Sequence, residues 1–274
     1  MSVKTFAAID VGSFELTMKI FDFSGKNTMR EIDCIHQRID LGSDTYANGK
    51  ISNEKMDDLC HTLKEFSQSM ESYKVIAYKA YGTSAIRETE NTLILQDQIE
   101  QRTGIRVEIL SNSEQRFLDY KSIASKGETF RRIIEEKTAI LDIGGGSIQI
   151  SLFDKDTLVS TQNLRLGVLR LQELLNHLNA GSTQMEQLVD ELATAQLDDY
   201  KKLYLKDREI KNIIIVDDYL SPWAVRKAHE RGDGNAMVDS KAFDQLMESL
   251  RTRGTTELAK RMDIAEEKVP LVYI

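Results

Sequence analysis

The same short pattern occurs twice in this chain, once near the N-terminus and once in the middle. An apolar strand runs into Asp10-Val11-Gly12-Ser13, and a second runs into Asp142-Ile143-Gly144-Gly145-Gly146-Ser147. Each is followed by a segment in which apolar and polar residues alternate, Leu16 to Ile20 and Ile148 to Leu152, which is typical of a β-hairpin with a tight turn. A duplicated hairpin predicts a duplicated domain.

The residue types in these turns suit a phosphate group and a cation. Glycines allow positive φ angles, so successive backbone N–H groups can point into one concavity and donate to phosphate oxygens. The serine hydroxyl adds a donor, and the aspartate at each strand end, Asp10 or Asp142, can hold a hydrated Mg²⁺. We expect the two loops to face each other across a cleft and clamp a phosphate group. Two simpler interpretations stay open: the glycines serve only a tight turn, and each aspartate caps its own loop.

Composition indicates a folded protein of two packed units. A chain of 274 residues is large for one hydrophobic core, and 41% hydrophobic with 29% charged residues is ordinary for a globular protein. The net charge of −8 and the pI near 5.2 argue against indiscriminate binding to nucleic acid or to an anionic membrane, because the average field repels polyanions. We therefore expect neither nucleic acid nor a membrane as a partner.

Cysteine usage and the N-terminus bear on the cellular compartment. The two cysteines, Cys34 and Cys60, have no paired spacing and no accompanying histidine cluster, so the sequence predicts neither a disulfide framework nor a zinc site. The segment from Met1 to Phe6 enters the first strand at once, and no apolar run reaches about 18 residues. These features predict a cytoplasmic protein without a signal peptide or a membrane span.

Apolar periodicity predicts alternating strands and helices on either side of a charged stretch. After the first hairpin we expect helices at 53–69 and 93–102, a buried strand at 75–81, a strand at 105–110 and a helix ending at 124. After the second hairpin we expect a strand at 157–164, helices at 168–178 and 183–202, a strand at 213–216, and helices ending at 228 and spanning 241–253. The charged stretch from Gly127 to Lys137 is the expected boundary, which gives domains at 1–126 and 137–274.

The second domain is expected to lack its C-terminal elements. A domain that matched the first half would need another strand and helix near the apolar segment from Val269 to Ile274. The sheet would then have an exposed edge, and a second copy of the chain, forming a homodimer, is one way to cover it.

Two further segments place reactive side chains at strand ends. Thr83-Ser84-Ala85-Ile86-Arg87 brings two hydroxyls and a guanidinium to a place where α/β proteins bind ligands, and Arg87 can hold a phosphate bidentately. The simpler interpretation of this segment is an N-capped helix with a surface arginine. Glu114-Gln115 opens a helix after another strand, where a carboxylate can orient a water for attack on phosphorus. The same glutamate also suits the helix dipole.

Together these segments resemble the Ppx/GppA phosphohydrolase family, the exopolyphosphatases and guanosine pentaphosphate phosphatases of the actin/hexokinase superfamily. The resemblance covers nearly the whole chain and rests on the order and spacing of five segments: Ala7 to Ser13, Arg38 to Gly42, Thr83 to Glu88 with Asn91, Asp142 to Ser147, and Leu166 to Leu171. It implies an α/β fold of two ribonuclease-H-like domains with mixed sheets.

The resemblance also implies a ligand, a cofactor and residue roles. The ligand is inorganic polyphosphate or a guanosine penta- or tetraphosphate, and a Mg²⁺-assisted water attacks the terminal phosphoryl group. The implied phosphate-binding residues are Gly12, Ser13, Thr83, Ser84, Arg87, Gly144, Gly145, Gly146 and Ser147. The metal positions are Asp10, Asp142 and Gln149, and the catalytic positions are Glu114 and Gln115.

Several residues depart from the family pattern. Phe14 and Glu15 replace an asparagine and a serine of the first loop, which removes one amide and one hydroxyl. In ungapped register the catalytic glutamate falls on Gln115, and a neutral amide cannot accept a proton from water as a carboxylate can. Gln149 stands where a carboxylate is expected near the metal, and Val216 to Ser221 puts bulky and acidic side chains where the family has a glycine-rich loop.

These departures leave two functions in competition. The first is a phosphohydrolase of reduced rate, in which Glu114 stands in as the base. The second is a regulator that binds polyphosphate or guanosine phosphates without fast turnover. A sugar kinase or actin-like ATPase would need a glycine-rich adenosine loop in the second domain, which residues 217–220 do not provide.

Overall fold

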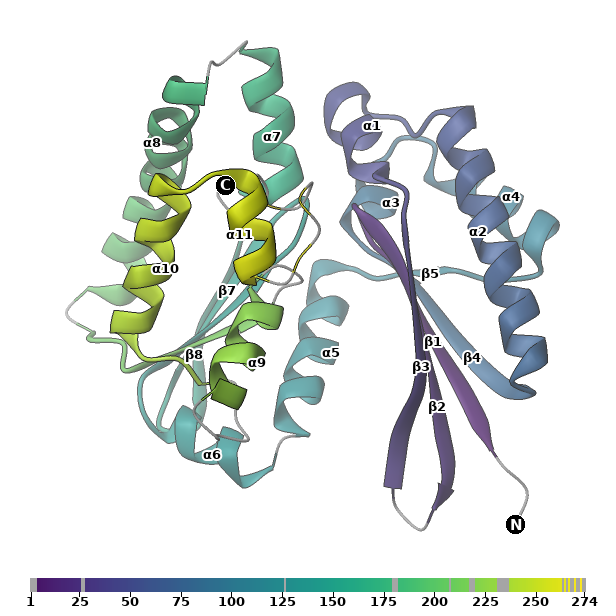
Figure 1. Cartoon of the computed structure of the whole chain (residues 1–274), viewed down its shortest axis with the longest axis horizontal. Helices are drawn as coiled ribbons and strands as arrows, with labels where there is room; N and C mark the ends of the chain where they lie inside the picture. Colours follow the sequence, from purple (N-terminus) through teal and green to yellow (C-terminus); the bar gives the residue numbers. More distant parts are fainter. Residues whose placement is uncertain are drawn as a thin grey trace. The chain divides into compact units, whose positions relative to one another are not determined.

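The computed structural model of the chain consists of two compact units, residues 1–121 and residues 122–274 (Figure 1). It describes residues 4–25, 28–125, 127–178, 182–206, 208–216, 220–230 and 237–262, and residues 264, 266, 269 and 272. Each unit contains a mixed β-sheet with helices, so the α/β organisation matches the expectation from the sequence.

Unit 1 has a five-stranded sheet in the order β3-β2-β1-β4-β5, in which β1, β2 and β3 are antiparallel and β4 and β5 join in parallel. Its strands are β1 (Thr5–Val11), β2 (Glu15–Gly25), β3 (Thr28–Arg38), β4 (Val75–Gly82) and β5 (Glu108–Ile109). Its helices are α1 (Leu41–Asn48), α2 (Asn53–Ser72), α3 (Ser84–Glu88), α4 (Thr92–Thr103) and α5 (Asn112–Ala124), the last of which crosses the unit boundary.

The unit 1 core includes alternating apolar side chains of the sheet and the apolar stripe of helix α2. Leu16, Met18 and Ile20 alternate along β2 and are fully buried, whereas the residues between them lie on the second face of the sheet. Helix α2 buries Leu59 and Phe66 on the apolar stripe that the sequence predicts. Its N-cap residue is Ser52, whose hydroxyl accepts from the N–H of Lys55. The second face of the sheet therefore carries the side chains of β2 that alternate with these core residues, together with their register partners on β3.

Unit 2 has a four-stranded sheet in the order β8-β7-β6-β9, with β6, β7 and β8 antiparallel and β9 parallel to β6. Its strands are β6 (Thr138–Ile143), β7 (Ile148–Asp154), β8 (Thr157–Leu164) and β9 (Asn212–Val216). Its helical segments are α6 (Glu128–Glu135), α7 (Val168–His177), α8 (Ser182–Tyr200), η1 (Lys201–Leu205), α9 (Ser221–Glu230), α10 (Ser240–Thr252) and α11 (Thr255–Met262). The order repeats that of β3-β2-β1-β4, and within the described ranges no strand corresponds to β5.

Three segments differ from the sequence expectation. The charged stretch from Gly127 to Lys137 forms helix α6, which buries Phe130 and Ile134. Strand β4 was expected to be buried, but the side chain of Ile76 is 68% exposed. The strand expected at 105–110 is paired only at Glu108–Ile109. In the part of the chain that the structure describes, no helix combines the length and the apolar character needed to cross a bilayer.

Candidate functional site

The first glycine loop joins β1 to β2 and is held by the segment that follows β3. The N–H of Gly12 donates to the carbonyl of Glu15 at 3.2 Å, and a Cβ on Gly12 would lie only 2.8 Å from that oxygen. The N–H of Gly42 donates to the carbonyl of Ser13 at 2.7 Å, and the N–H of Asp40 donates to the carbonyl of Phe14 at 2.8 Å. Glycine at position 12 is therefore required by close backbone approach.

Three hydroxyl groups meet beside this loop. The hydroxyl oxygen of Ser13 lies 2.9 Å from those of Tyr46 and Ser84, and the Tyr46 oxygen lies 3.0 Å from that of Ser84. Ser13 and Ser84 are buried, so their hydroxyl groups find hydrogen-bond partners in one another and in Tyr46. Thr83 joins the same region, because its N–H donates to the carbonyl of Val11 at 3.2 Å. The structure thus brings three predicted phosphate-binding residues of unit 1 together.

The second glycine loop joins β6 to β7 and is built in the same way. The N–H of Gly144 donates to the carbonyl of Ser147 at 3.0 Å, and the N–H of Val168 donates to the carbonyl of Gly144 at 3.2 Å. A Cβ on Gly167 would lie 2.2 Å from the backbone of Gly146 and Ser147. The start of α7 therefore presses directly against the backbone of the glycine loop.

Two polar side chains from neighbouring elements donate hydrogen bonds to the second loop. The guanidinium Nε of Arg170 donates to the carbonyl of Gly146 at 2.8 Å, and the amide of Asn163 donates to the hydroxyl of Ser147 at 3.1 Å. The sequence motif from Leu166 to Leu171 thus has a structural role, since it covers and fixes the loop that carries Gly144, Gly145 and Gly146.

Asp142 and Gln149 form a pair across β6 and β7. They face each other in the strand register, and the Gln149 side-chain amide donates to a carboxylate oxygen of Asp142 at 3.1 Å. Gln149 is 3% exposed, and its own side-chain oxygen is buried without a hydrogen-bond partner. In unit 1 the corresponding register partner of Asp10 is Thr17, and Asp10 is exposed.

Among the described residues, no group of three or more His, Cys, Asp or Glu side chains has a geometry that could hold a metal ion. A Mg²⁺ ion that keeps most of its water needs only one or two carboxylates and a phosphate. Asp10, and Asp142 beside the unpartnered oxygen of Gln149, therefore fit a hydrated Mg²⁺ but not an all-protein cage.

Arg87 and Gln115 lie together. One guanidinium nitrogen of Arg87, Nη1, donates to the carbonyl of Leu110 at 2.7 Å and lies 3.4 Å from the side-chain oxygen of Gln115. Arg87 is half-buried, so it is not the surface arginine of the simpler interpretation. Thr83 precedes α3 but makes no side-chain capping hydrogen bond, which also departs from that interpretation.

Glu114 caps its own helix. Its carboxylate accepts from the N–H of Ser111 at 2.9 Å and from the Ser111 hydroxyl at 2.7 Å, while its N–H donates to that hydroxyl at 3.2 Å. This reciprocal arrangement is a capping box, and the Ser-x-x-Glu pattern that announces it is visible in the sequence. The hydrogen bonds from the backbone and the hydroxyl of Ser111 lower the pKa of Glu114, which makes its carboxylate a weaker base.

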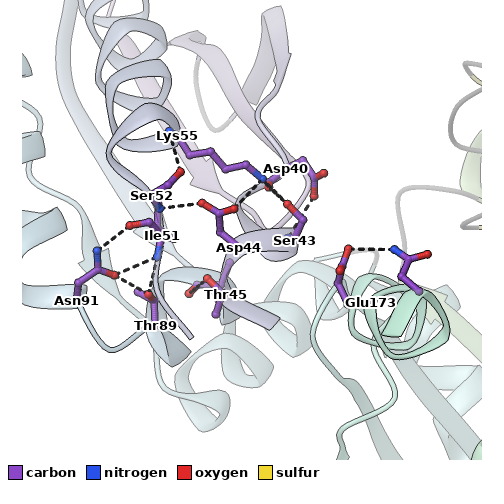
Figure 2. Close-up of polar contacts among 12 residues, drawn as sticks. Asp40, Ser43, Asp44, Thr45, Ile51, Ser52, Lys55, Thr89, Asn91 and Glu173 are labelled. Carbon is purple, nitrogen blue, oxygen red and sulfur yellow. Dashed lines mark hydrogen bonds and ion pairs between the residues drawn. The ribbon is translucent and has the colours of Figure 1, made fainter. Parts of the chain in front are cut away.

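The segment after β3 is fixed by a polar network that the sequence reasoning missed (Figure 2). The ammonium of Lys55 contacts the carbonyl of Asp40 and the hydroxyl of Ser43, and it lies 3.6 Å from the carboxylate of Asp44. That carboxylate accepts from the N–H of Ser52 at 2.7 Å. Burial alone would raise the pKa of Asp44, but the hydrogen bonds from Ser52 and the charge of Lys55 outweigh it and lower the pKa.

The departures in the first loop also have a structural account. Phe14 is 7% exposed, and the guanidinium of Arg38 lies 4.7 Å from the centre of its ring, which suits a cation–π contact. Of the loop from Val216 to Ser221, residues 217–219 lie outside the described residues.

Comparisons with known proteins agree on one family. The model of the Ppx/GppA phosphatase family matches residues 21–262. A bifunctional 3-dehydroquinate synthase/phosphatase of Fusobacterium nucleatum is 23% identical over 210 residues, which cover 72% of this chain and 31% of that protein. Exopolyphosphatase 1 of Mycobacterium tuberculosis is 26% identical over 144 residues, which cover 52% of this chain and 40% of that protein. The matches thus span less than half the length of these two relatives.

Solved structures show the same fold. A Ppx/GppA family member from Aquifex aeolicus has a TM-score of 0.73 at 17% identity and covers 99% of this chain and 87% of its own. An exopolyphosphatase from Cytophaga hutchinsonii has a TM-score of 0.70 at 19% identity and covers 98% of this chain and 89% of its own. These likenesses confirm the predicted α/β, actin-like fold class. With the family model matching most of its length, the chain belongs to the Ppx/GppA phosphatase family.

Proposed function

We propose that the chain binds the phosphate chain of inorganic polyphosphate or guanosine pentaphosphate and releases the terminal phosphate slowly. The N–H groups of Gly12 and Gly144 are engaged within their own turns, so the other backbone N–H groups of the glycine loops would donate to phosphate. Ser13, Ser84 and Arg87 add hydroxyl and guanidinium donors in unit 1. Asp10 in unit 1 or Asp142 in unit 2 would hold a hydrated Mg²⁺, and the ion would neutralise charge on the phosphate oxygens. Membership of the family and the exopolyphosphatase relatives support this assignment.

The contact between Arg87 and Gln115 carries the proposal. A guanidinium suited to a phosphate group lies 3.4 Å from the residue at the family's catalytic position, which supports the register in which the base is an amide. An amide can orient water through its oxygen but cannot take up its proton. General-base assistance is typically worth about 10² to 10⁴ in rate, so hydrolysis without it is slow rather than absent.

The capping role of Glu114 favours the second function, binding with a regulatory purpose. Its carboxylate is engaged by Ser111 at 2.7 and 2.9 Å, so it would have to give up the cap to reach a water molecule. If it does not, the chain is a polyphosphate- or guanosine phosphate-binding protein whose turnover is negligible.

Parallel measurements of binding and phosphate release distinguish the two. The chain is titrated by calorimetry with polyphosphate and with guanosine pentaphosphate in the presence of Mg²⁺, and phosphate release is followed over hours. Slow release that is lost in Arg87→Gln supports the hydrolase, whereas binding without release supports the regulator. Absence of binding to either compound overturns both. Arg102→Gln, which removes an exposed arginine of α4 that pairs with Asp57, is the control and should change neither quantity.

A further inference from the structure

Four side chains outside the glycine loops form a second polar cluster. Glu15 and Thr17 come from β2, and Cys34 and His36 come from β3, on the face of the sheet opposite the core. The strand register places Thr17 directly across from His36. None of these four residues has a role in the proposed phosphate chemistry.

The distances in this cluster are those of a nucleophile, a base and an orienting group. The sulfur of Cys34 lies 3.0 Å from Nε2 of His36. The other ring nitrogen, Nδ1, lies 3.0 Å from the hydroxyl of Thr17 and 3.4 Å from a carboxylate oxygen of Glu15. A nucleophile within hydrogen-bond reach of a base, with the base oriented by a third group, is the arrangement of an activated nucleophile.

The carboxylate fixes which nitrogen of His36 carries the proton. An ionised Glu15 can only accept, so it favours the tautomer in which Nδ1 carries the hydrogen. Nε2 is then an acceptor and faces the Cys34 thiol, which donates to it. In this tautomer, Nε2 of His36 can accept a proton from sulfur.

The charges around Cys34 keep the resting thiol protonated. Burial raises its pKa, the ammonium of Lys19 lowers it, and the carboxylates of Glu31, Asp33 and Glu15 raise it, with a net rise. A thiol of this kind reacts at neutral pH only if a neighbouring base takes its proton as the new bond forms. The other cysteine, Cys60, is 3% exposed in the unit 1 core.

We propose that Cys34 is a modification site for low-molecular-weight disulfides and that His36 acts as its general base. The thiol proton passes to Nε2 of His36 while the Cys34 sulfur attacks one sulfur of the disulfide. A new S–S bond forms, the original S–S bond breaks, and the departing thiolate takes the proton from His36. The disulfide is the only co-reactant, and the products are a mixed disulfide on Cys34 and a free thiol.

The rate of mixed-disulfide formation tests this. The full chain is incubated with glutathione disulfide at neutral pH, adducts are timed by intact mass, and the modified cysteine is assigned by peptide mapping. We expect one adduct, on Cys34, formed at least about tenfold more slowly in His36→Gln. Thr17→Val, which keeps thiol and imidazole but removes the hydroxyl beside Nδ1, should slow it by a smaller factor.

The control is His61→Gln, an exposed histidine of α2, which should react at the wild-type rate. An adduct on Cys60 alone, no adduct at all, or an unchanged rate in a His36→Gln protein that melts at the wild-type temperature would overturn the proposal. None of these readouts depends on phosphate release, so the test stands or fails separately from the proposed function.

Discussion

At the scale of single residues, the buried amide of Gln149 determines the charge of its site. Its side-chain nitrogen donates to Asp142 at 3.1 Å, so this pair in the unit 2 sheet carries one negative charge rather than two. A carboxylate at the same place would lie beside Asp142 with little solvent, and two like charges at such a distance raise each other's pKa and oppose folding.

Gln149→Glu should therefore destabilise the protein and make its stability depend on Mg²⁺. We expect the free energy of unfolding to fall on the order of 1–3 kcal/mol without the ion, because a buried hydrogen bond is replaced by repulsion. A cation that binds only the folded form restores stability. Thermal melts with and without magnesium chloride measure this. Gln196→Glu, on the exposed side of α8, should melt as wild type under both conditions, and a Gln149→Glu melt insensitive to magnesium would count against a metal role here.

At the scale of elements, both glycine loops are supported by the segment that follows the third strand. Gly42 donates to the first loop, and Gly167 and Val168 press on the second. In each unit a buried leucine precedes the supporting glycine, Leu41 at 0% and Leu166 at 2% exposure. The loop and its support are thus one structural unit that is repeated in the chain.

Gly167→Ala should show how tightly that unit is packed. Its Cβ would lie 2.2 Å from loop backbone, which cannot move away as a flexible side chain would. We expect a loss of about 3 kcal/mol or more, at the upper end for overpacking, measured by urea denaturation. Gly254→Ala is the matched control, because nothing lies within 4 Å of its Cβ. Equal stabilities of the two variants would mean that the second loop is not pressed against α7.

The network of Asp44 and Lys55 joins the start of α1 to the start of α2 (Figure 2). The pKa of Asp44 is lowered in the folded chain, so its stabilising effect is full above the unfolded pKa of about 3.9 and is lost as the pH falls through the folded value.

Asp44→Asn should therefore be less stable than wild type at neutral pH, and the difference should shrink as the pH is lowered below about 4. Urea midpoints of both proteins over this range measure it. Asp97→Asn is the control, since Asp97 accepts from Gln101, an exposed glutamine of α4. A difference between Asp44→Asn and wild type that stays constant down to the lowest pH would contradict the assigned network.

Apolar periodicity predicts most of the helices and strands, but the mostly polar helices α1 and α6 were not predicted. Helix α2 follows apolar spacing closely, and strand β8 has the predicted bounds. Helix α1 has few apolar residues. Its N-cap residue is Asp40, which has a φ of 56° and whose carboxylate accepts from the N–H of Ser43. Helix α6 was not predicted because of its charged residues, although Phe130 and Ile134 have the four-residue spacing of a buried helical face.

At the candidate site, the sequence predicts the backbone turns that glycines mark. The repeat predicts tight turns at Gly12 and Gly144, and both turns occur. Neither glycine has the positive φ that the sequence analysis invoked. Side-chain partners formed across the fold could not be predicted, because Tyr46 and Ser84 meet over a separation of 38 residues. The capping role of Glu114 could have been predicted from Ser111, three residues earlier.

At the scale of the whole molecule, one sheet architecture occurs twice. The sheets share the order β3-β2-β1-β4 and β8-β7-β6-β9, and each opens with a glycine-containing hairpin. Gln115 and Gln149 are the two amides at positions where the resemblance implies acidic residues. In the proposed function, phosphate binding persists without the general base.

Steady-state phosphate release from polyphosphate with Mg²⁺, compared between wild type and Gln115→Glu, tests this claim most directly. Restoring a carboxylate beside Arg87 should raise turnover by about a hundredfold or more while leaving polyphosphate affinity within a few-fold. Gln101→Glu, on the exposed surface of α4, should leave turnover unchanged. A Gln115→Glu protein that folds and binds polyphosphate as wild type does, yet releases phosphate no faster, would contradict the account.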